Sequence, residues 1–220
     1  METPTKKIIF LIGANSNFIQ ELINEYDLTT FYDKIIYVSH RPYNFTLSNK
    51  KESFVNFSSR EDIYKELSSI TYAKNSIDIL FSNTPTNLKE MNDRTLEWAK
   101  YPRVFMQDIC KLNNINRCIY LGSTLALVPI IKDSLYKRLK RREFSEYIKF
   151  RDTFKSNVCY ILLPPIDDNL TGIGYLFKEQ KIYWINEVMK SLNTKDKIII
   201  PRGLNGILTR ILLSFKRIKL

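Results

Sequence analysis

The chain has 220 residues, 44% of them hydrophobic, which is enough for one domain with a sizeable core and excludes a disordered protein. Its formal net charge of +11 favours an anionic partner such as a phosphate, a nucleic acid or an acidic membrane, although a codon bias toward lysine, asparagine and isoleucine would give the same charge. No apolar run approaches the roughly 18 residues of a membrane span, and we expect no signal peptide because the start is short and polar. The cysteines are too scattered for a disulfide framework or a zinc site, and we expect them to be reduced core residues of a cytosolic protein: Cys110, Cys118 and Cys159.

Apolar runs of strand length alternate with segments of helical periodicity along the whole chain. In chain order we expect a strand at 7–12, a helix at 18–26, strands at 34–39 and 55–57, a helix at 60–70, a strand at 77–81, a helix at 95–112, a strand at 117–121, a helix at 134–150, a strand at 157–163, a helix at 182–192 and a strand at 197–200. Strands this apolar are buried on both faces, so the pattern predicts an α/β fold with a doubly wound parallel sheet. We assign residues 1–202 to this single compact domain and residues 203–220 to a basic amphipathic C-terminal helix.

Polar residues follow the expected strands at the ends where such sheets bind ligands. These short segments are Gly13 to Asn17, His40 and Arg41, Asn83 and Thr84, Ser123 and Thr124, and Ile166 and Asp167. Because the carboxyl ends of parallel strands lie along one edge of a sheet, we expect the ligand site at that edge.

Tyr136 and Lys140 are four residues apart on an expected helix, so their side chains lie on one face of it. Ser123 ends the strand that precedes this helix. Such a group suits proton transfer to or from a carbinol, because a nearby ammonium stabilises a phenolate and a serine hydroxyl can hold the substrate oxygen. The spacing alone also fits a solvated basic helix with a packed tyrosine. Position favours the catalytic interpretation, since the pair follows the fifth strand and the serine ends that strand.

With these features the chain resembles the short-chain dehydrogenase/reductase family, over residues 7 to about 202. The resemblance rests on the Gly13 turn, the stretch Asn83, Thr84 and Pro85, the residues Ser123, Tyr136 and Lys140, and the Pro164–Pro165 turn. It implies a Rossmann fold, NADP or NAD as cofactor, and Ser123, Tyr136 and Lys140 as catalytic residues. The cofactor-binding residues that it implies are Gly13, Asn15, Ser16, Asn17, Phe18, Arg41, Asn83, Thr84, Pro85, Tyr136, Lys140, Pro165 and Ile166.

Three positions depart from the family pattern. The family often has an asparagine early in the helix before the fifth strand, where this chain has Ala99, so a proton relay through that position is in doubt. The first loop keeps Gly13, but Asn17 and Ile19 occupy the other two glycine positions of Gly-x-x-x-Gly-x-Gly. Ser16 and Phe18 fit a divergent form of the loop. The N–H groups at the helix start remain, and three side chains can also donate, so we expect cofactor binding to be retained but weakened: Asn15, Ser16 and Asn17.

Arg41, after the second strand, suits the 2′-phosphate of NADP better than the free ribose of NAD, unless it is only a solvated loop residue. His40 is the only histidine, and we expect a surface or adenine-side contact there rather than a catalyst or a metal ligand. We expect no metal site.

Only residues 167–180 separate the sixth strand from the next helix, which indicates a compact reductase or an epimerase-like protein with a trimmed substrate lobe.

The tail after Gly203 has apolar residues at helical spacing with basic residues among them. It is suited to an anionic membrane surface, and the alternative is a helix packed on its own domain or on a second subunit.

The functional prediction is an NAD(P)-dependent oxidoreductase or epimerase that acts on a sugar nucleotide or lipid-linked sugar in bacterial surface polysaccharide synthesis. We expect it in the cytoplasm or at the inner face of the membrane, and the resemblance implies a homodimer. The alternative is a scaffold protein that kept the fold and lost turnover. A nucleic-acid binder ranks last, because the basic residues are spread out and no recognition motif is present.

Overall fold

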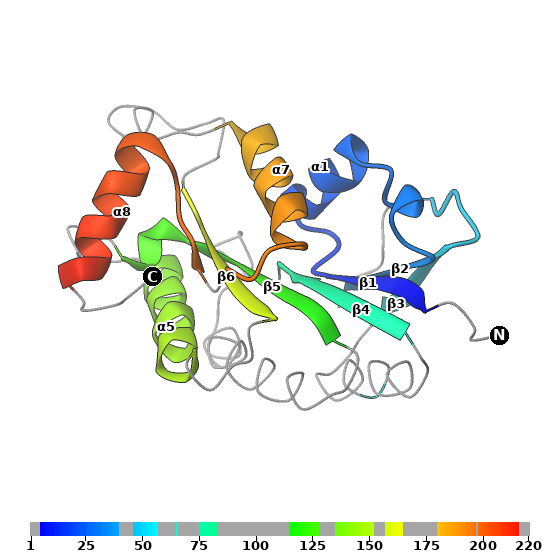
Figure 1. The fold of residues 1–220 in the computed structure, drawn as a ribbon, viewed down its shortest axis with the longest axis horizontal. Helices are drawn as coiled ribbons and strands as arrows, with labels where there is room; N and C mark the ends of the chain where they lie inside the picture. The colour runs from blue at the N-terminus through cyan, green and yellow to red at the C-terminus, as the bar shows by residue number, and fades with distance from the viewer. Residues whose placement is uncertain are drawn as a thin grey trace. The chain divides into compact units, whose positions relative to one another are not determined.

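A computed structural model describes residues 5–39, 46–56, 65, 75–82, 115–127, 135–151, 157–164, 180–196 and 198–215 (Figure 1). The strands are β1 (Lys6–Ile12), β2 (Lys34–Ser39), β3 (Glu52–Asn56), β4 (Asn75–Phe81), β5 (Ile115–Ser123), β6 (Val158–Leu163) and β7 (Ile198–Ile199). The helices are α1 (Asn17–Glu25), α5 (Leu135–Phe150), α7 (Lys181–Ser191) and α8 (Gly203–Phe215), with short 3₁₀ turns η1 (Leu28–Thr30) and η3 (Thr124–Ala126). The strands form one seven-stranded sheet in the order β3-β2-β1-β4-β5-β6-β7, which is the order of a doubly wound dinucleotide-binding fold.

This order confirms the predicted doubly wound sheet, and the expected strands all occur. The third strand differs most from the prediction, because it begins at Glu52 rather than at residue 55. It is an edge strand of half-buried residues, so its sequence lacks the continuous apolar run that marks the buried strands. Apart from residue 65, the expected helices at 60–70 and 95–112 lie outside the described residues.

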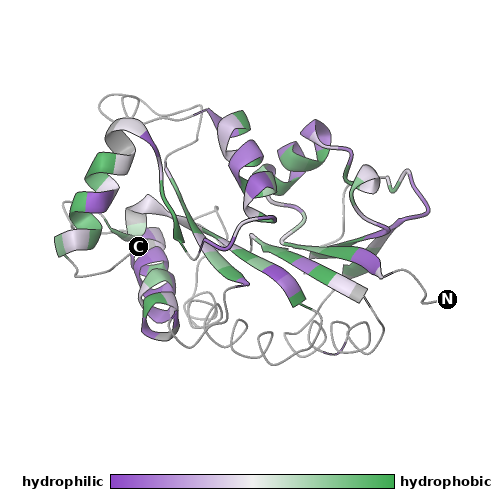
Figure 2. Ribbon diagram, viewed as in Figure 1, coloured by the Kyte–Doolittle hydropathy of each residue, from purple (hydrophilic) through white to green (hydrophobic). Residues whose placement is uncertain are grey.

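The chain divides into two compact units, residues 1–84 with 108–119 and residues 85–107 with 120–220. In the first unit, β1 pairs in parallel with β2 and β4, and β2 pairs in parallel with β3. β1 is hydrophobic after its first two residues, and residues 8–12 are buried (Figure 2). This central strand therefore supplies the core of the first unit.

Asp78 is a buried carboxyl on β4 in the first unit. Its Oδ2 accepts a hydrogen bond from the Tyr32 hydroxyl at 2.9 Å, and its Oδ1 accepts one from Asn116 Nδ2 at 2.8 Å. Burial raises the pKa of Asp78 above its ordinary value, although the hydrogen bonds from Asn116 and Tyr32 and the charge of Lys7 act against this shift. Burial and the Asp78 carboxylate raise the pKa of Tyr32, so that phenol stays neutral.

In the second unit, Tyr160 on β6 is fully buried among aromatic rings. Its ring centroid is 5.2 Å from that of Tyr120, 5.4 Å from that of Phe144 and 4.9 Å from that of Tyr147. The Tyr160 hydroxyl has no hydrogen-bond partner among the described residues. Its ring also fills the place where a Cβ at Gly122 would lie, so only glycine fits at that position of β5.

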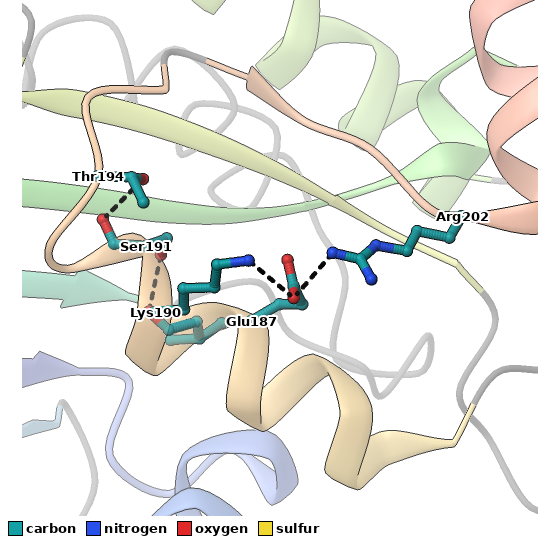
Figure 3. Close-up of polar contacts among 6 residues, drawn as sticks. Glu187, Lys190, Ser191, Thr194 and Arg202 are labelled. Carbon is teal, nitrogen blue, oxygen red and sulfur yellow. Dashed lines mark hydrogen bonds and ion pairs between the residues drawn. The ribbon is translucent and has the colours of Figure 1, made fainter.

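Contacts from α7 reach the segment that leads into α8 (Figure 3). Arg202 Nη2 lies 3.5 Å from Glu187 Oε1, and the Arg202 guanidinium lies over the Tyr183 ring at 5.6 Å from its centroid. Lys190 Nζ lies 3.9 Å from the same carboxylate oxygen. These exposed ion pairs contribute little stability, but they direct Arg202 toward α7.

Cys118 and Cys159 are buried and reduced, as predicted, and Cys110 lies outside the described residues. Within the described ranges, no helix is both long enough and apolar enough to cross a bilayer.

Asp78→Asn should change how stability depends on pH. A carboxyl whose pKa is higher in the folded than in the unfolded state favours folding when protonated, so its contribution is lost as pH rises from about 3.8 through the folded-state pKa. Asparagine cannot titrate. We therefore expect the free energy of unfolding of the wild type, minus that of the variant, to fall as pH rises through this window in urea titrations. A difference that rises with pH would contradict the raised pKa of Asp78.

Tyr160→Phe should stabilise the protein by about 1 kcal/mol, because it removes a buried hydroxyl that has no partner among the described residues. Tyr32→Phe is the matched control, since the same change there removes a hydrogen bond to Asp78. We expect that control to lose about 1 to 3 kcal/mol. Urea denaturation measures both, and a loss of stability in Tyr160→Phe equal to that in Tyr32→Phe would show that the Tyr160 hydroxyl is satisfied in the folded protein.

Candidate functional site

The strand order of the first unit reverses between β1 and β4, and open α/β sheets bind ligands at such a switch point, outside the carboxyl ends of the strands. Ile12 at the end of β1 is paired with Phe81 at the end of β4. One residue further, Ser82 N–H donates to the Ile12 carbonyl at 2.8 Å. The segments that follow these two strands therefore begin side by side, as a ligand site at this edge requires.

The turn after β1 depends on Gly13, which has a φ of +83°. Residues with a side chain rarely adopt this left-handed region. The N–H groups of Gly13 and Ala14 both donate to the Val38 carbonyl, at 2.9 and 3.0 Å, and Ser16 N–H donates to the Gly13 carbonyl at 2.8 Å. The turn is thus tied to β2, and these N–H groups serve the fold.

Helix α1 starts directly after this turn. Ser16 is its N-cap, and its Oγ accepts a hydrogen bond from Ile19 N–H at 3.3 Å. Ile19 is fully buried, so a core side chain fills the position of the family's third glycine, whereas Asn17 at the second glycine position is exposed. The N–H groups of Asn17 and Phe18 open the helix, and together with the positive end of the helix dipole they suit an anionic group.

Side chains brace this loop from within the first unit. Asn15 Nδ2 donates to Ser39 Oγ at the end of β2 over 3.2 Å, and Gln20 Nε2 donates to the Ala14 carbonyl. The sequence pattern suggested Asn15 as a ligand donor and gave no role to Ser39 or Gln20. The structure shows that the Asn15 amide holds the loop against β2.

The second unit contains the other predicted group. Ser123 is a buried residue at the end of β5, and η3 begins at the next residue. η3 contacts α5, the helix that carries Tyr136 and Lys140. Lys140 Nζ lies over the Tyr136 ring at 5.7 Å from its centroid, which confirms that the two side chains share one face of the helix.

Lys140 also has a partner that the sequence did not suggest. Its ammonium forms an ion pair with Glu143 Oε2 at 3.0 Å, and the two residues are only 3% and 2% exposed. A buried charge of either sign requires such a partner. The carboxylate compensates the charge of Lys140, which reduces the field that this ammonium exerts on the Tyr136 phenol. The i, i+3 spacing was the only signal of this pair in the sequence.

Tyr160 on β6 packs against α5, the helix that carries Tyr136 and Lys140. Burial raises its pKa well above the usual range, and the charges of Glu143, Tyr136 and Tyr147 raise it further. Tyr160 therefore remains a neutral phenol next to residues of α5. It contacts Gly122, the residue before Ser123, through its ring.

No protein-family model matches the chain, and no curated protein matches it in sequence. Its structure is similar to that of a short-chain dehydrogenase from Burkholderia cenocepacia in complex with NADP, with a TM-score of 0.72 and 12% identity over 97% of this chain and 95% of that chain. The fold is that of the short-chain dehydrogenases. A dTDP-glucose 4,6-dehydratase from Bacillus anthracis in complex with NAD has a TM-score of 0.64, at 9% identity over 98% and 82% of the two chains. Glucuronic acid dehydrogenase from Chromohalobacter salexigens has a TM-score of 0.68, at 10% identity over 91% and 78%.

Of the residues predicted for the site, the structure describes the Gly13 turn and the start of α1 in the first unit, and Ser123, Tyr136 and Lys140 in the second unit. The other predicted residues lie outside the described part of the chain: His40, Arg41, Asn83, Thr84, Pro85, Ala99, Pro165 and Ile166. Among the described residues, no group of three or more histidine, cysteine, aspartate or glutamate side chains is arranged to hold a metal ion.

Proposed function

We propose that the protein is an NAD(P)-dependent oxidoreductase or epimerase of the short-chain type. The observation that carries this proposal is the arrangement of Tyr136 and Lys140 on one face of α5, which contacts the turn directly after Ser123. Two solved structures with the same fold contain NADP or NAD. The N–H groups of Asn17 and Phe18 at the start of α1 support binding of the cofactor pyrophosphate in this chain.

The bound nicotinamide would supply hydride transfer. Tyr136 would give a proton to the substrate oxygen or take one from it, as the general acid or base. The Ser123 hydroxyl would hold that oxygen by a hydrogen bond. Lys140 would bind the ribose and stabilise the phenolate, with Glu143 fixing the direction of its ammonium. Arg41 would favour NADP over NAD through the 2′-phosphate.

For the substrate we propose a sugar nucleotide or a lipid-linked sugar, used in bacterial surface polysaccharide synthesis. Two proteins with the same fold, a dTDP-glucose dehydratase and a glucuronic acid dehydrogenase, act on sugars, as their names state. The short stretch of sequence at 167–180 would suit a small open substrate site rather than a large lobe. We further propose that the enzyme works in the cytoplasm, or at the inner face of the membrane, as a homodimer.

A catalytically inactive scaffold is the second candidate, and two observations favour it. The buried pair of Lys140 with Glu143 compensates the charge that the catalytic role uses. Ile19 fills the space near the loop that a glycine leaves open in the family. A scaffold of this kind would bind no nicotinamide cofactor, or would bind one without turnover.

Tyr136→Phe tests the proposal. The change keeps the ring and removes only the acidic proton, so we expect hydride transfer to fall at least about 100-fold while cofactor affinity stays within about twofold. The assay follows nicotinamide absorbance with nucleotide-linked and lipid-linked sugars as substrates. Tyr183→Phe, on a half-buried tyrosine of α7, is the matched control and should keep the wild-type rate. A Tyr136→Phe rate close to that of the wild type would refute the acid–base role, and turnover absent from the wild type would favour the scaffold.

A further inference from the structure

One face of α8 packs within the second unit. Gly206, Thr209 and Leu213 are buried and follow one another at helical spacing. The carbonyl oxygen of Pro201 occupies the place of a Cβ at Gly206, so this end of the helix lies tight against the preceding backbone. α8 is therefore held on its unit by this face, as the packed-helix alternative predicted, and its opposite face points away.

That opposite face is apolar and exposed. Ile207 is 56%, Leu208 43%, Ile211 45% and Phe215 81% exposed. Positions 207, 211 and 215 are separated by four residues each, and position 208 is three before 211, so the side chains form one stripe along the helix. Figure 2 shows hydrophobic residues along most of α8. A helix face that remains in water is usually polar. An exposed apolar stripe therefore indicates a surface that contacts another protein or a membrane.

The charge of this part of the sequence favours one kind of partner for the stripe. Arg210 is exposed one residue before Ile211, on the flank of the stripe. After Asp196 the sequence has no acidic residue and six basic ones: Lys197, Arg202, Arg210, Lys216, Arg217 and Lys219. Pairing this face with the same face of a second copy would bring the Arg210 guanidinium groups of the two copies to one interface. An apolar stripe flanked by Arg210, in a part of the sequence that has basic and no acidic residues, instead matches an anionic lipid surface, which offers negative headgroups above an apolar interior.

We propose that α8 docks this protein on the surface of an anionic phospholipid bilayer, with Ile207, Leu208, Ile211 and Phe215 inserted below the headgroups and Arg210 among them. The helix has 13 residues and a length of roughly 20 Å, so it lies in the plane of the surface and does not span the bilayer. Its buried face stays on the protein. Docking through α8 requires neither turnover nor cofactor binding.

Sedimentation of the full-length protein with vesicles tests the proposal. We expect binding to vesicles that contain phosphatidylglycerol in phosphatidylcholine at low salt, and much weaker binding to phosphatidylcholine alone. Ile207→Ser with Ile211→Ser should weaken binding at least about tenfold, because the apolar area that enters the bilayer is lost. Arg210→Gln should weaken it roughly fivefold, which is the contribution of one basic residue, and should reduce its sensitivity to salt.

Phe31→Ser is the matched control, because Phe31 is 53% exposed in the first unit and lies outside α8. It should bind vesicles as the wild type does. The double change of Ile207 and Ile211 to leucine keeps the apolar area and should restore binding, which separates a surface effect from misfolding. Analytical ultracentrifugation of the same variants measures whether each is a monomer or a dimer.

Three outcomes would overturn the proposal. The wild-type protein could remain in the supernatant with anionic vesicles at low salt. It could bind neutral and anionic vesicles equally. Alternatively, the serine variant could convert a dimer to a monomer without any change in vesicle binding, which would assign the stripe to an interface between two copies of the chain.

Discussion

The ring of Tyr160 occupies the space beside Gly122 that any other residue would fill with a side chain. The same ring also packs against Phe144 and Tyr147 of α5. One buried ring therefore sets the spacing between the end of β5 and the helix after it. Ser123 follows Gly122 directly, and Tyr136 and Lys140 lie near the start of that helix, so the proposed catalytic group depends on this contact. The position of the Tyr160 ring in the core lowers stability, because its buried hydroxyl has no partner among the described residues.

Burial also constrains the charge at this site. Lys140 lies inside the second unit, and a buried ammonium without a carboxylate would strongly favour an alternative arrangement of the helix. Glu143 removes that penalty and fixes the ammonium over the Tyr136 ring. The same ion pair weakens the field of Lys140 at the Tyr136 phenol. It therefore stabilises the helix but reduces the effect of Lys140 on the tyrosine. In the first unit, the Gly13 turn shows a similar compromise, since two of its N–H groups serve β2.

Much of the fold could be predicted from the sequence, because parallel strands that are buried on both faces have continuous apolar sequences, as in residues 34–39 and 158–163. The shared face of Tyr136 and Lys140 followed from helical spacing alone. Contacts between distant segments could not be predicted in this way. The apolar run around Tyr160 shows that this residue is buried, but not that its ring meets Gly122. Likewise, the capping role of Ser16 depends on where α1 begins, which periodicity locates only to within a few residues.

The central claim is that Lys140, although paired with Glu143, binds the ribose of a nicotinamide cofactor. Fluorescence titration with NADPH tests it most directly, with Lys140→Met compared with Lys137→Met on the same helix. We expect the wild type to bind NADPH, Lys140→Met to weaken binding roughly tenfold through loss of a charge-assisted hydrogen bond, and Lys137→Met to have no effect. Equal NADPH affinity in the wild type and Lys140→Met, or no binding to the wild type, would contradict it.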